Sequence, residues 1–433
     1  LFDHSMALAA YLGLVSVGLV ALLVALNGGH GPSPWRAVPG ITLRLCLQAL
    51  PLTLVLFLLF PRLSSPLWSL SLDSGVGLMG MSDRLEPGAI GELVANGDLA
   101  FRVRFEQDPP AGDRLFWRGL ILWGPDERGW SPGLDPSWPL PAAMEPLGET
   151  IDYEVLLEPT RQRWLFSLDL PLGLPEGQLR SGDFQLLAKE PITSARRYRL
   201  RSTLAYRTGE PPAWVRERAL VLPPNVTERM RRLVADWQAE TRDPWGLVQA
   251  GLRFFNREAF HYTLLPPRLG ANPRDEFLFV TRRGFCEHFA DGFAVLMRLA
   301  GVPSRIVLGY LGGEPNRMGG YHVVWQSDAH AWVEVLIPGR GWVRVDPTAA
   351  VDPSRVDNRS ASRLLGASAP LRFAVAPPGA LVQALRQLRL LADSLDAAWE
   401  DWVIDYSSRH QRSLLERLGL EDLKETGLAV LMM

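Results

Sequence analysis

The chain has 433 residues, which is too long for one ordinary domain and allows two or three. Its 45 basic and 47 acidic side chains leave a formal net charge of −2, so no overall field recruits nucleic acid and we predict no such partner. The two cysteines, Cys46 and Cys286, lie in unrelated contexts. We therefore expect no disulfide framework, and each thiol is either part of a core or a nucleophile.

The first 60 residues contain two long apolar segments. Residues 5–26 carry no charge, and residues 38–60 carry only Arg44. Each segment has about the 20 residues that cross roughly 30 Å of hydrocarbon, so residues 1–60 predict a hairpin of two transmembrane helices in a lipid bilayer. Arg36 and Arg44 lie near the tip of this hairpin. By the positive-inside rule the tip is cytoplasmic and the rest of the chain is extracytoplasmic.

A linker rich in serine, proline and glycine is predicted over residues 61–97, and a small β-rich module over residues 98–210. Apolar and polar residues alternate over 100–105, 151–157 and 198–204, with proline and glycine between the runs. Because no reactive side chains gather there, we interpret the module as a spacer or a substrate-presenting element.

Helical periodicity takes over from Thr227 and continues through a helix that begins at Cys286. Short strands are predicted after it, and a helix followed by an antiparallel sheet indicates an α+β core over residues 211–365. Residues 366–433 predict a helical tail that leads toward a truncated further span. Since the chain starts without methionine and stops as a new apolar run begins, we expect it to be a piece of a longer membrane protein.

Three side chains suited to acyl transfer follow one another along the core. Cys286 opens a helix, His330 lies inside a strand, and Asp346 closes the next strand. In thiol-based acyl transfer a thiolate attacks a carbonyl, an imidazole moves the proton, and a carboxylate fixes the tautomer of the ring. Each residue alone has a structural explanation, as a buried hydrophobe, a hydrogen-bonded histidine and a turn former. Their joint placement, with an anion favoured at the helix N-terminus, favours a catalytic set.

The geometry of the last hairpin makes this interpretation testable. Because side chains alternate between the faces of a strand, Asp346 must share a face with His330 in order to orient its ring. A four-residue loop would put Asp346 on the wrong face. We therefore predict a three-residue loop over residues 338–340, followed by Gly341 with a positive φ. In this register Trp332 lies opposite Asp346, and His330 is diagonal to it and within reach.

Several segments of the chain match a known family. They are residues 117–119, 260–264, 275–279, 283–290, 297–310, 328–335 and 341–348, together with the spans that precede them. These segments resemble the transglutaminase-like core of bacterial membrane-anchored proteins. The resemblance implies a papain-like, transglutaminase-like α+β fold, with Cys286 as nucleophile, His330 as base and Asp346 as orienting acid. It also implies the substrates: a glutamine-bearing protein or peptide forms a thioester with the cysteine, and a primary amine then accepts the acyl group.

Several further residues are predicted to support this site. The oxyanion would be held by the Cys286 backbone N–H and by a second donor, Tyr262 or a tryptophan such as Trp332. His288 would support the helix start or the wall of the cleft. The one cysteine and the nearby histidines lack the usual spacing of structural zinc ligands, so we predict neither a metal nor a cofactor.

The resemblance implies a multi-pass protein of the bacterial cytoplasmic (inner) membrane, with the catalytic domain on the periplasmic side, in agreement with the distribution of arginines. Two other hypotheses stay open. A cysteine peptidase or deamidase would use the same three residues. A non-catalytic scaffold would bind envelope proteins or peptidoglycan peptides, although such a domain has no need for all three side chains.

Overall fold

The structure is a computed structural model that describes residues 6–27, 34–59, 83–86, 97–133, 144–352, 355 and 380–399. It divides into two compact units, one made of Leu1–Gly75 with Pro378–Met433 and the other of Val76–Pro377. Most of the predicted linker, and the further span predicted near the C-terminus, lie outside the described residues. The second unit combines helices with sheets, as the predicted α+β class requires.

The first unit contains three helices in its described part, α1 (Met6–Asn27), α2 (Pro34–Leu59) and α10 (Ala380–Trp399). Both apolar segments of the N-terminal region are therefore helical, as predicted. Among the described residues, however, no helix combines the length and the apolar character that crossing a membrane requires. The helices of the predicted hairpin are present, but their crossing of a membrane is not supported.

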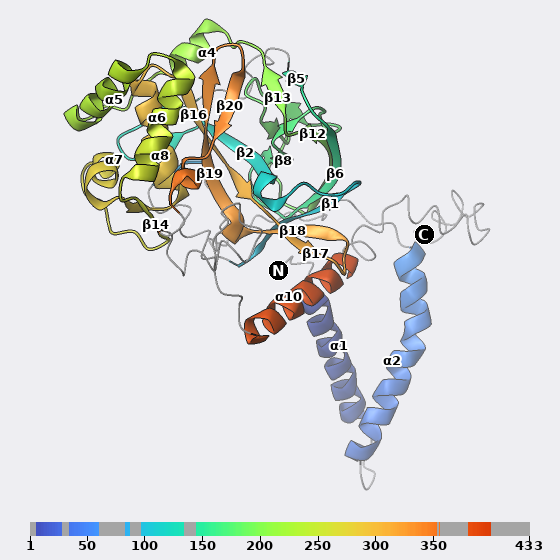
Figure 1. Ribbon diagram of the computed structural model, residues 1–433. Coiled ribbons are helices and arrows are strands. Elements are labelled where there is room, and N and C mark those ends of the chain that lie inside the picture. The colour runs from blue at the N-terminus through green and yellow to red at the C-terminus, as the bar shows by residue number, and fades with distance from the viewer. Residues whose placement is uncertain are drawn as a thin grey trace. The chain divides into compact units, whose positions relative to one another are not determined.

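The second unit is built in layers around a five-stranded sheet of order β20-β19-β16-β2-β8 (Figure 1). Helices cover one face of this sheet, and a six-stranded sheet of order β17-β18-β1-β6-β12-β9 covers the other. The central strands are β2 (Phe116–Leu122), β8 (Ser167–Leu168), β16 (Ser304–Leu311), β19 (Ala329–Ile337) and β20 (Gly341–Val345). The second sheet contains β1 (Leu99–Phe105), β6 (Thr150–Leu157), β9 (Leu170–Pro171), β12 (Arg196–Thr203), β17 (Glu314–Asn316) and β18 (Tyr321–Trp325).

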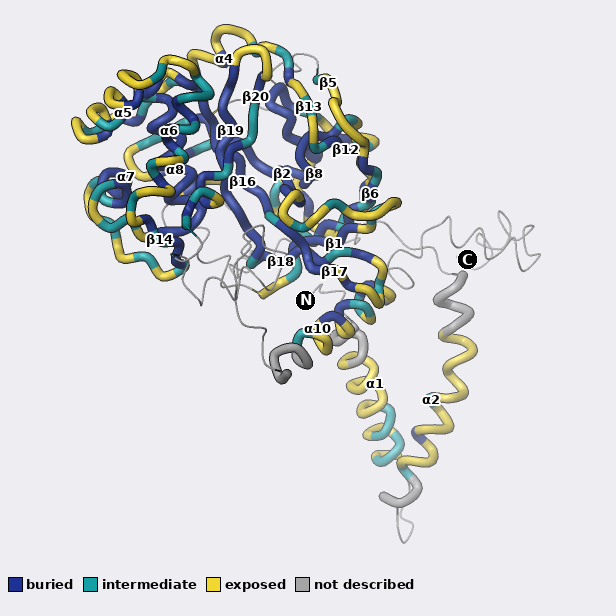
Figure 2. Tube along the Cα trace, in the orientation of Figure 1, coloured by how far each residue is buried: buried dark blue, intermediate teal, exposed yellow. Residues whose placement is uncertain are grey.

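The helical layer consists of α5 (Glu228–Glu240), α6 (Pro244–Arg257) and α8 (Cys286–Leu299). The side chains of Thr227 and Asp243 accept backbone N–H groups at the starts of α5 and α6, which explains where these helices begin. Figure 2 shows that the central strands are buried over most of their length, whereas α5 is largely exposed on its outer side. The smaller helices and 3₁₀ or π turns are η1 (Gly112–Arg114), α4 (Ala213–Arg218), α7 (Pro273–Glu276), η2 (Phe277–Thr281), η3 (Gln326–Asp328) and η4 (Pro347–Ala350).

Short strands complete the unit at its edges and connections. They are β3 (Gly124–Pro125), β4 (Trp130–Ser131), β5 (Met144–Pro146), β7 (Trp164–Leu165), β10 (Leu179–Arg180), β11 (Leu186–Leu187), β13 (Tyr206–Thr208), β14 (His261–Tyr262) and β15 (Arg283–Gly284).

The prediction of a separate β-rich module over residues 98–210 is wrong. Strand β2 lies between β16 and β8 in the central sheet, and β1 lies between β18 and β6 in the second sheet. Both sheets therefore combine strands from before residue 210 with strands from after it. All seven residues of β2 are buried, so this strand lacks the apolar and polar alternation that marks a half-buried strand in a sequence.

The predicted loop between the last two strands is confirmed. Ile337 pairs with Gly341, which leaves residues 338–340 as the loop, and Gly341 has a φ of +75°. Val333 pairs with Val345, so the register continues to place Trp332 opposite Asp346. The alternative four-residue loop is excluded.

Candidate active site

The chain enters helix α8 through a turn that only a glycine fits. Strand β15 pairs in parallel with β14, Phe285 is extended, and the helix begins at Cys286. A Cβ on Gly284 would lie 2.8 Å from the Cβ of His288, closer than real side chains approach. Cys286 is almost fully buried at the helix N-terminus, where unpaired backbone N–H groups and the helix dipole favour an anion.

His330 and Asp346 meet at the end of the central sheet. His330 Nε2 lies 2.8 Å from Asp346 Oδ2. The other carboxylate oxygen, Oδ1, accepts the Thr348 hydroxyl at 2.6 Å and the Thr348 backbone N–H at 3.0 Å, which caps η4. Both oxygens of Asp346 thus have a fixed partner, so the carboxylate can hold the ring of His330 in one orientation.

The charges of this cluster reinforce one another. Burial lowers the pKa of His330, but Asp346 and the neighbouring Cys286 outweigh this effect and raise that pKa to about 10. Burial works against ionisation of Asp346 as well, yet His330 and Thr348 hold the pKa of Asp346 below its ordinary value. The imidazolium and the carboxylate are therefore both charged at neutral pH. A hydrogen bond between the His330 side chain and the Cys286 side chain contributes to this balance and joins the three residues into one site.

Tyr262 lies at the same site. It is buried on β14 beside Gly284 and stacks on Phe289 of α8, with ring centroids 6.2 Å apart. Burial raises the pKa of Tyr262 well above its ordinary value, and the charges of Cys286 and Asp346 raise it further. A hydrogen bond from the Cys286 backbone N–H acts in the opposite direction. The neutral hydroxyl thus lies next to the N–H that the sequence predicts as an oxyanion donor.

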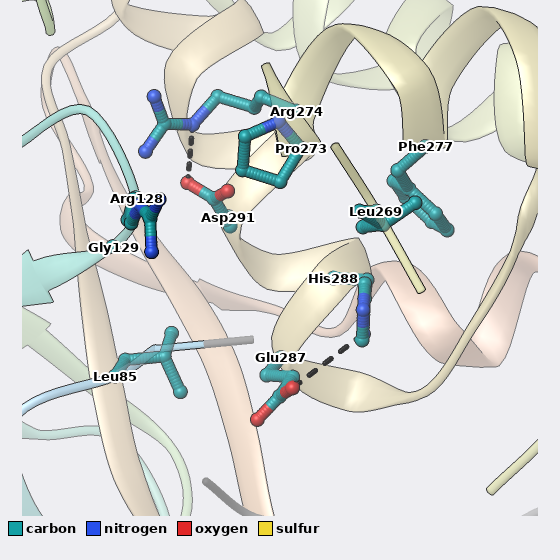
Figure 3. A pocket seen from close by; sticks show the side chains of 10 residues that line it. All are labelled: Leu85, Arg128, Gly129, Leu269, Pro273, Arg274, Phe277, Glu287, His288 and Asp291. Carbon is teal, nitrogen blue, oxygen red and sulfur yellow. Dashed lines mark hydrogen bonds and ion pairs between the residues drawn. The ribbon is translucent and has the colours of Figure 1, made fainter. Parts of the chain in front are cut away.

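His288 faces a small pocket on another side of the first turn of α8 (Figure 3). This cavity measures about 10 Å³, which is roughly the space of one water molecule. His288 Nδ1 lies 3.7 Å from Glu287 Oε1, and burial lowers the pKa of His288 to about 4, so its ring is neutral at pH 7. The ring packs on Phe285 and Phe277, in agreement with a role in supporting the helix start.

Trp332 packs behind the site and does not line an open cleft. Its ring stacks beside His330 at 6.3 Å and meets Phe116 of β2 edge to face at 5.3 Å. Trp332 is 1% exposed, and within the described part of the chain its Nε1 has no hydrogen-bond partner. Among the described residues no cluster of three or more metal-binding side chains occurs.

Sequence reasoning missed two parts of this site. Thr348 was visible only as the end of a matching segment, although its hydroxyl fixes Asp346. Phe116 comes from a strand assigned to a separate module, and its ring lies 6.3 Å from that of His330. The alternation of side chains along β20 could have pointed to Arg344, which shares the face of Asp346. No comparable signal existed for Phe116.

The chain is similar to known proteins along most of its length. Residues 1–209 match the family described as the TgpA N-terminal domain, and residues 239–347 match the transglutaminase-like superfamily. A Pseudomonas aeruginosa protein named protein-glutamine gamma-glutamyltransferase is 39% identical over 96% of this chain, which spans 63% of that protein. YebA of Bacillus subtilis is 34% identical over 30% of this chain and 19% of its own length.

A solved structure agrees with these matches. The periplasmic domain of TgpA from Pseudomonas aeruginosa, bound to ethylmercury, has 39% sequence identity and a TM-score of 0.61. The similarity covers 64% of this chain and 99% of that domain. From the two family matches and the relative of similar sequence, the chain belongs to the transglutaminase-like superfamily, in the branch that carries the TgpA N-terminal domain.

Proposed function

We propose that the chain is a thiol acyltransferase of the transglutaminase type, with Cys286 as nucleophile, His330 as general acid and base, and Asp346 as the orienting acid. The observation that carries the proposal is the 2.8 Å contact between His330 Nε2 and Asp346 Oδ2 beside a thiol that begins a helix. The name of the Pseudomonas aeruginosa relative agrees with the same reaction, protein-glutamine gamma-glutamyl transfer.

In the proposed first half of the reaction, the Cys286 thiolate attacks the side-chain carboxamide carbon of a glutamine. The His330 imidazolium gives its proton to the leaving nitrogen, ammonia departs, and a thioester remains on the sulfur. In the second half a primary amine attacks the thioester. The neutral imidazole takes the proton of this amine, the new amide leaves, and the thiolate and imidazolium are restored.

The negative oxygen that forms in each half needs donors that are fixed in advance. We assign this task to the Cys286 backbone N–H and the Tyr262 hydroxyl. Support comes from the position of Tyr262 beside that N–H and from its raised pKa, which keeps the hydroxyl protonated and able to donate.

An amine-incorporation assay tests this function. The full chain is given a glutamine-bearing protein and a labelled primary amine, and covalent label is measured together with released ammonia. We expect label with the native chain and with Cys46→Ala, which removes the other cysteine, and none with Cys286→Ala. Ammonia without label would identify a deamidase, new chain termini would identify a peptidase, and absence of turnover would leave the scaffold hypothesis.

We further propose that the first unit attaches the protein to the bacterial cytoplasmic membrane, with the catalytic unit on the periplasmic side. The leucines at positions 12, 14, 19, 22, 23 and 26 of α1 are each more than half exposed, which is unusual for a water-facing helix. The related solved domain is periplasmic. Fractionation of cells checks this, because a chain that stays soluble after membranes are sedimented contradicts membrane attachment.

A further inference from the structure

A buried acid outside the proposed catalytic set lies at the connection between β8 and β9. Asp169 is 2% exposed and has a φ of +48°, in the left-handed region that few residues other than glycine adopt. Its backbone N–H donates to the carbonyl of Phe116 at 2.8 Å, and its Oδ1 accepts the Tyr206 hydroxyl at 3.0 Å. Burying a charged carboxylate and holding its backbone in a strained conformation both cost free energy, so we expect an oppositely charged partner for Asp169.

That partner is Arg344 of β20, whose guanidinium forms an ion pair with Asp169 Oδ2. The same guanidinium lies over the ring of Phe116, 4.0 Å from its centroid. Phe116 in turn neighbours His330, with ring centroids 6.3 Å apart. The ion pair with Asp169 and the contact with the Phe116 ring thus hold the Arg344 guanidinium next to the proposed active site.

Arg344 is also two residues before Asp346. Residues i and i+2 of a strand share a face, so the guanidinium and the Asp346 carboxylate project to the same side. Burial lowers the pKa of Arg344, but Asp169 and Tyr206 outweigh this effect and raise it, and the charge of Asp346 adds a smaller contribution in the same direction. A guanidinium can pair with a carboxylate through two parallel hydrogen bonds. If Arg344 paired with Asp346 in this way, the Asp346 oxygens would no longer be available to His330 and Thr348.

We propose that Asp169 is a positioning residue: its ion pair with Arg344 prevents Arg344 from pairing with Asp346, so the Asp346 carboxylate stays hydrogen-bonded to His330. The proposal rests on the proposed thiol acyl transfer and adds a residue to it. It gives the segment before residue 210 a part in the chemistry: this segment supplies both the acid that holds the arginine and the ring on which the arginine lies.

The key variant is Asp169→Asn, which keeps the shape of the side chain and tolerates the left-handed conformation. It frees Arg344 to pair with Asp346, so His330 loses its partner. We expect kcat for amine incorporation to fall by about 10²-fold, as small misplacements of catalytic groups produce. The double variant Asp169→Asn with Arg344→Met removes the competing cation. We expect it to recover most of the lost activity.

A second readout does not depend on the acyl-transfer reaction. In a Cys46→Ala background Cys286 is the one remaining cysteine. The rate at which iodoacetamide alkylates it is measured against pH, and the alkaline inflection reports loss of the imidazolium proton. The titratable groups that act on the pKa of this imidazolium are Asp346 at the end of β20 and Cys286 of α8, and both of these also act on the pKa of Tyr262 of β14. Asp169→Asn should lower the inflection by about one pH unit or more, as loss of an opposite charge does, and the double variant should restore it.

The controls separate positioning from general stability. Asp183→Asn removes another buried acid, which accepts the Trp123 indole N–H at 2.8 Å, and should lower the melting temperature without moving the inflection. Tyr206→Phe is the milder variant and is used if Asp169→Asn does not fold. It should lower the inflection by a smaller amount.

A wild-type inflection in folded Asp169→Asn or, failing that, in Tyr206→Phe would overturn the proposal. So would a double variant as impaired as the single one, or an equal shift in Asp183→Asn. If the native chain incorporates no amine while these shifts occur, the acyl-transfer function fails and the positioning role stands.

Discussion

The hydrogen bond from the Thr348 hydroxyl to Asp346 allows a stability prediction with a defined dependence on pH. Thr348 is 3% exposed, and its Oγ1 lies 2.6 Å from Asp346 Oδ1. Thr348→Val removes this hydroxyl with almost no change of shape and leaves the backbone N–H in place. A hydrogen bond to a charged group contributes about 1.5–3 kcal/mol. We expect the free energy of unfolding at pH 7 to fall by about that amount.

The sign of the pH dependence follows from the pKa of Asp346. Because the folded-state pKa is lowered, the ionised carboxylate stabilises the protein above its unfolded pKa of about 3.9, and this contribution is lost as the pH falls through the folded value. Removing the hydroxyl takes away one of the groups that lower this pKa, so the folded-state pKa of Asp346 rises toward its ordinary value. The difference between native and variant chains should therefore shrink as the pH falls below about 4.

Urea denaturation of the full chain from neutral to acid pH measures this difference. Thr348→Ser, which keeps the hydroxyl, is the matched control and should follow the native chain. A loss of stability in Thr348→Val that stays the same at every pH would refute the reasoning, because it would arise from packing and not from the charged carboxylate.

Further predictions concern the same end of the central sheet. Asp346→Asn should lower the pKa of His330 from about 10, because the carboxylate makes the largest of the contributions that oppose burial. The alkaline limb of kcat/KM should therefore move to lower pH in a pH–rate profile. An unmoved limb would show that Asp346 does not set this pKa. Gly309→Ala places a Cβ 1.9 Å from the Trp117 carbonyl oxygen, so we expect a loss of about 1–3 kcal/mol or more in thermal unfolding. Gly173→Ala meets no atom within 4 Å and should change the stability by about 0.5 kcal/mol at most.

The sequence allowed an accurate prediction of the elements that carry the proposed catalytic set. A helix was expected to begin at Cys286 and a strand to contain His330, and the structure has α8 beginning at Cys286 and β19 over Ala329–Ile337. These elements have clear local signals: a glycine turn before the helix, apolar residues with regular spacing, and a loop whose length is constrained by the face that Asp346 must share with His330.

The missed features depend on contacts between residues far apart in the sequence. Asp169 and Arg344 are 175 positions apart, and nothing near either residue indicates that they pair. Strand β2 is buried on both faces, so its sequence has no alternation, and its place between β16 and β8 could not be read from local pattern. The prediction of a separate module over residues 98–210 missed the shared sheets for this reason.

The pairing of β16 with β2, across residue 210, leads to a last prediction about which part of the chain folds alone. A fragment of residues 211–365, the predicted catalytic core, lacks β2 and so exposes the side of β16 that β2 covers. Four residues of β16 that pair with β2 carry buried apolar side chains: Ile306, Val307, Leu308 and Tyr310. Exposing these side chains costs about 6–12 kcal/mol at about 1.5–3 kcal/mol each, which is comparable to the whole stability of a domain. We expect this fragment to show no cooperative thermal unfolding and to be cleaved quickly by proteases, whereas residues 76–377 should melt cooperatively. Cooperative melting of the 211–365 fragment would contradict this, because the central sheet would then be stable without the strands that precede residue 210.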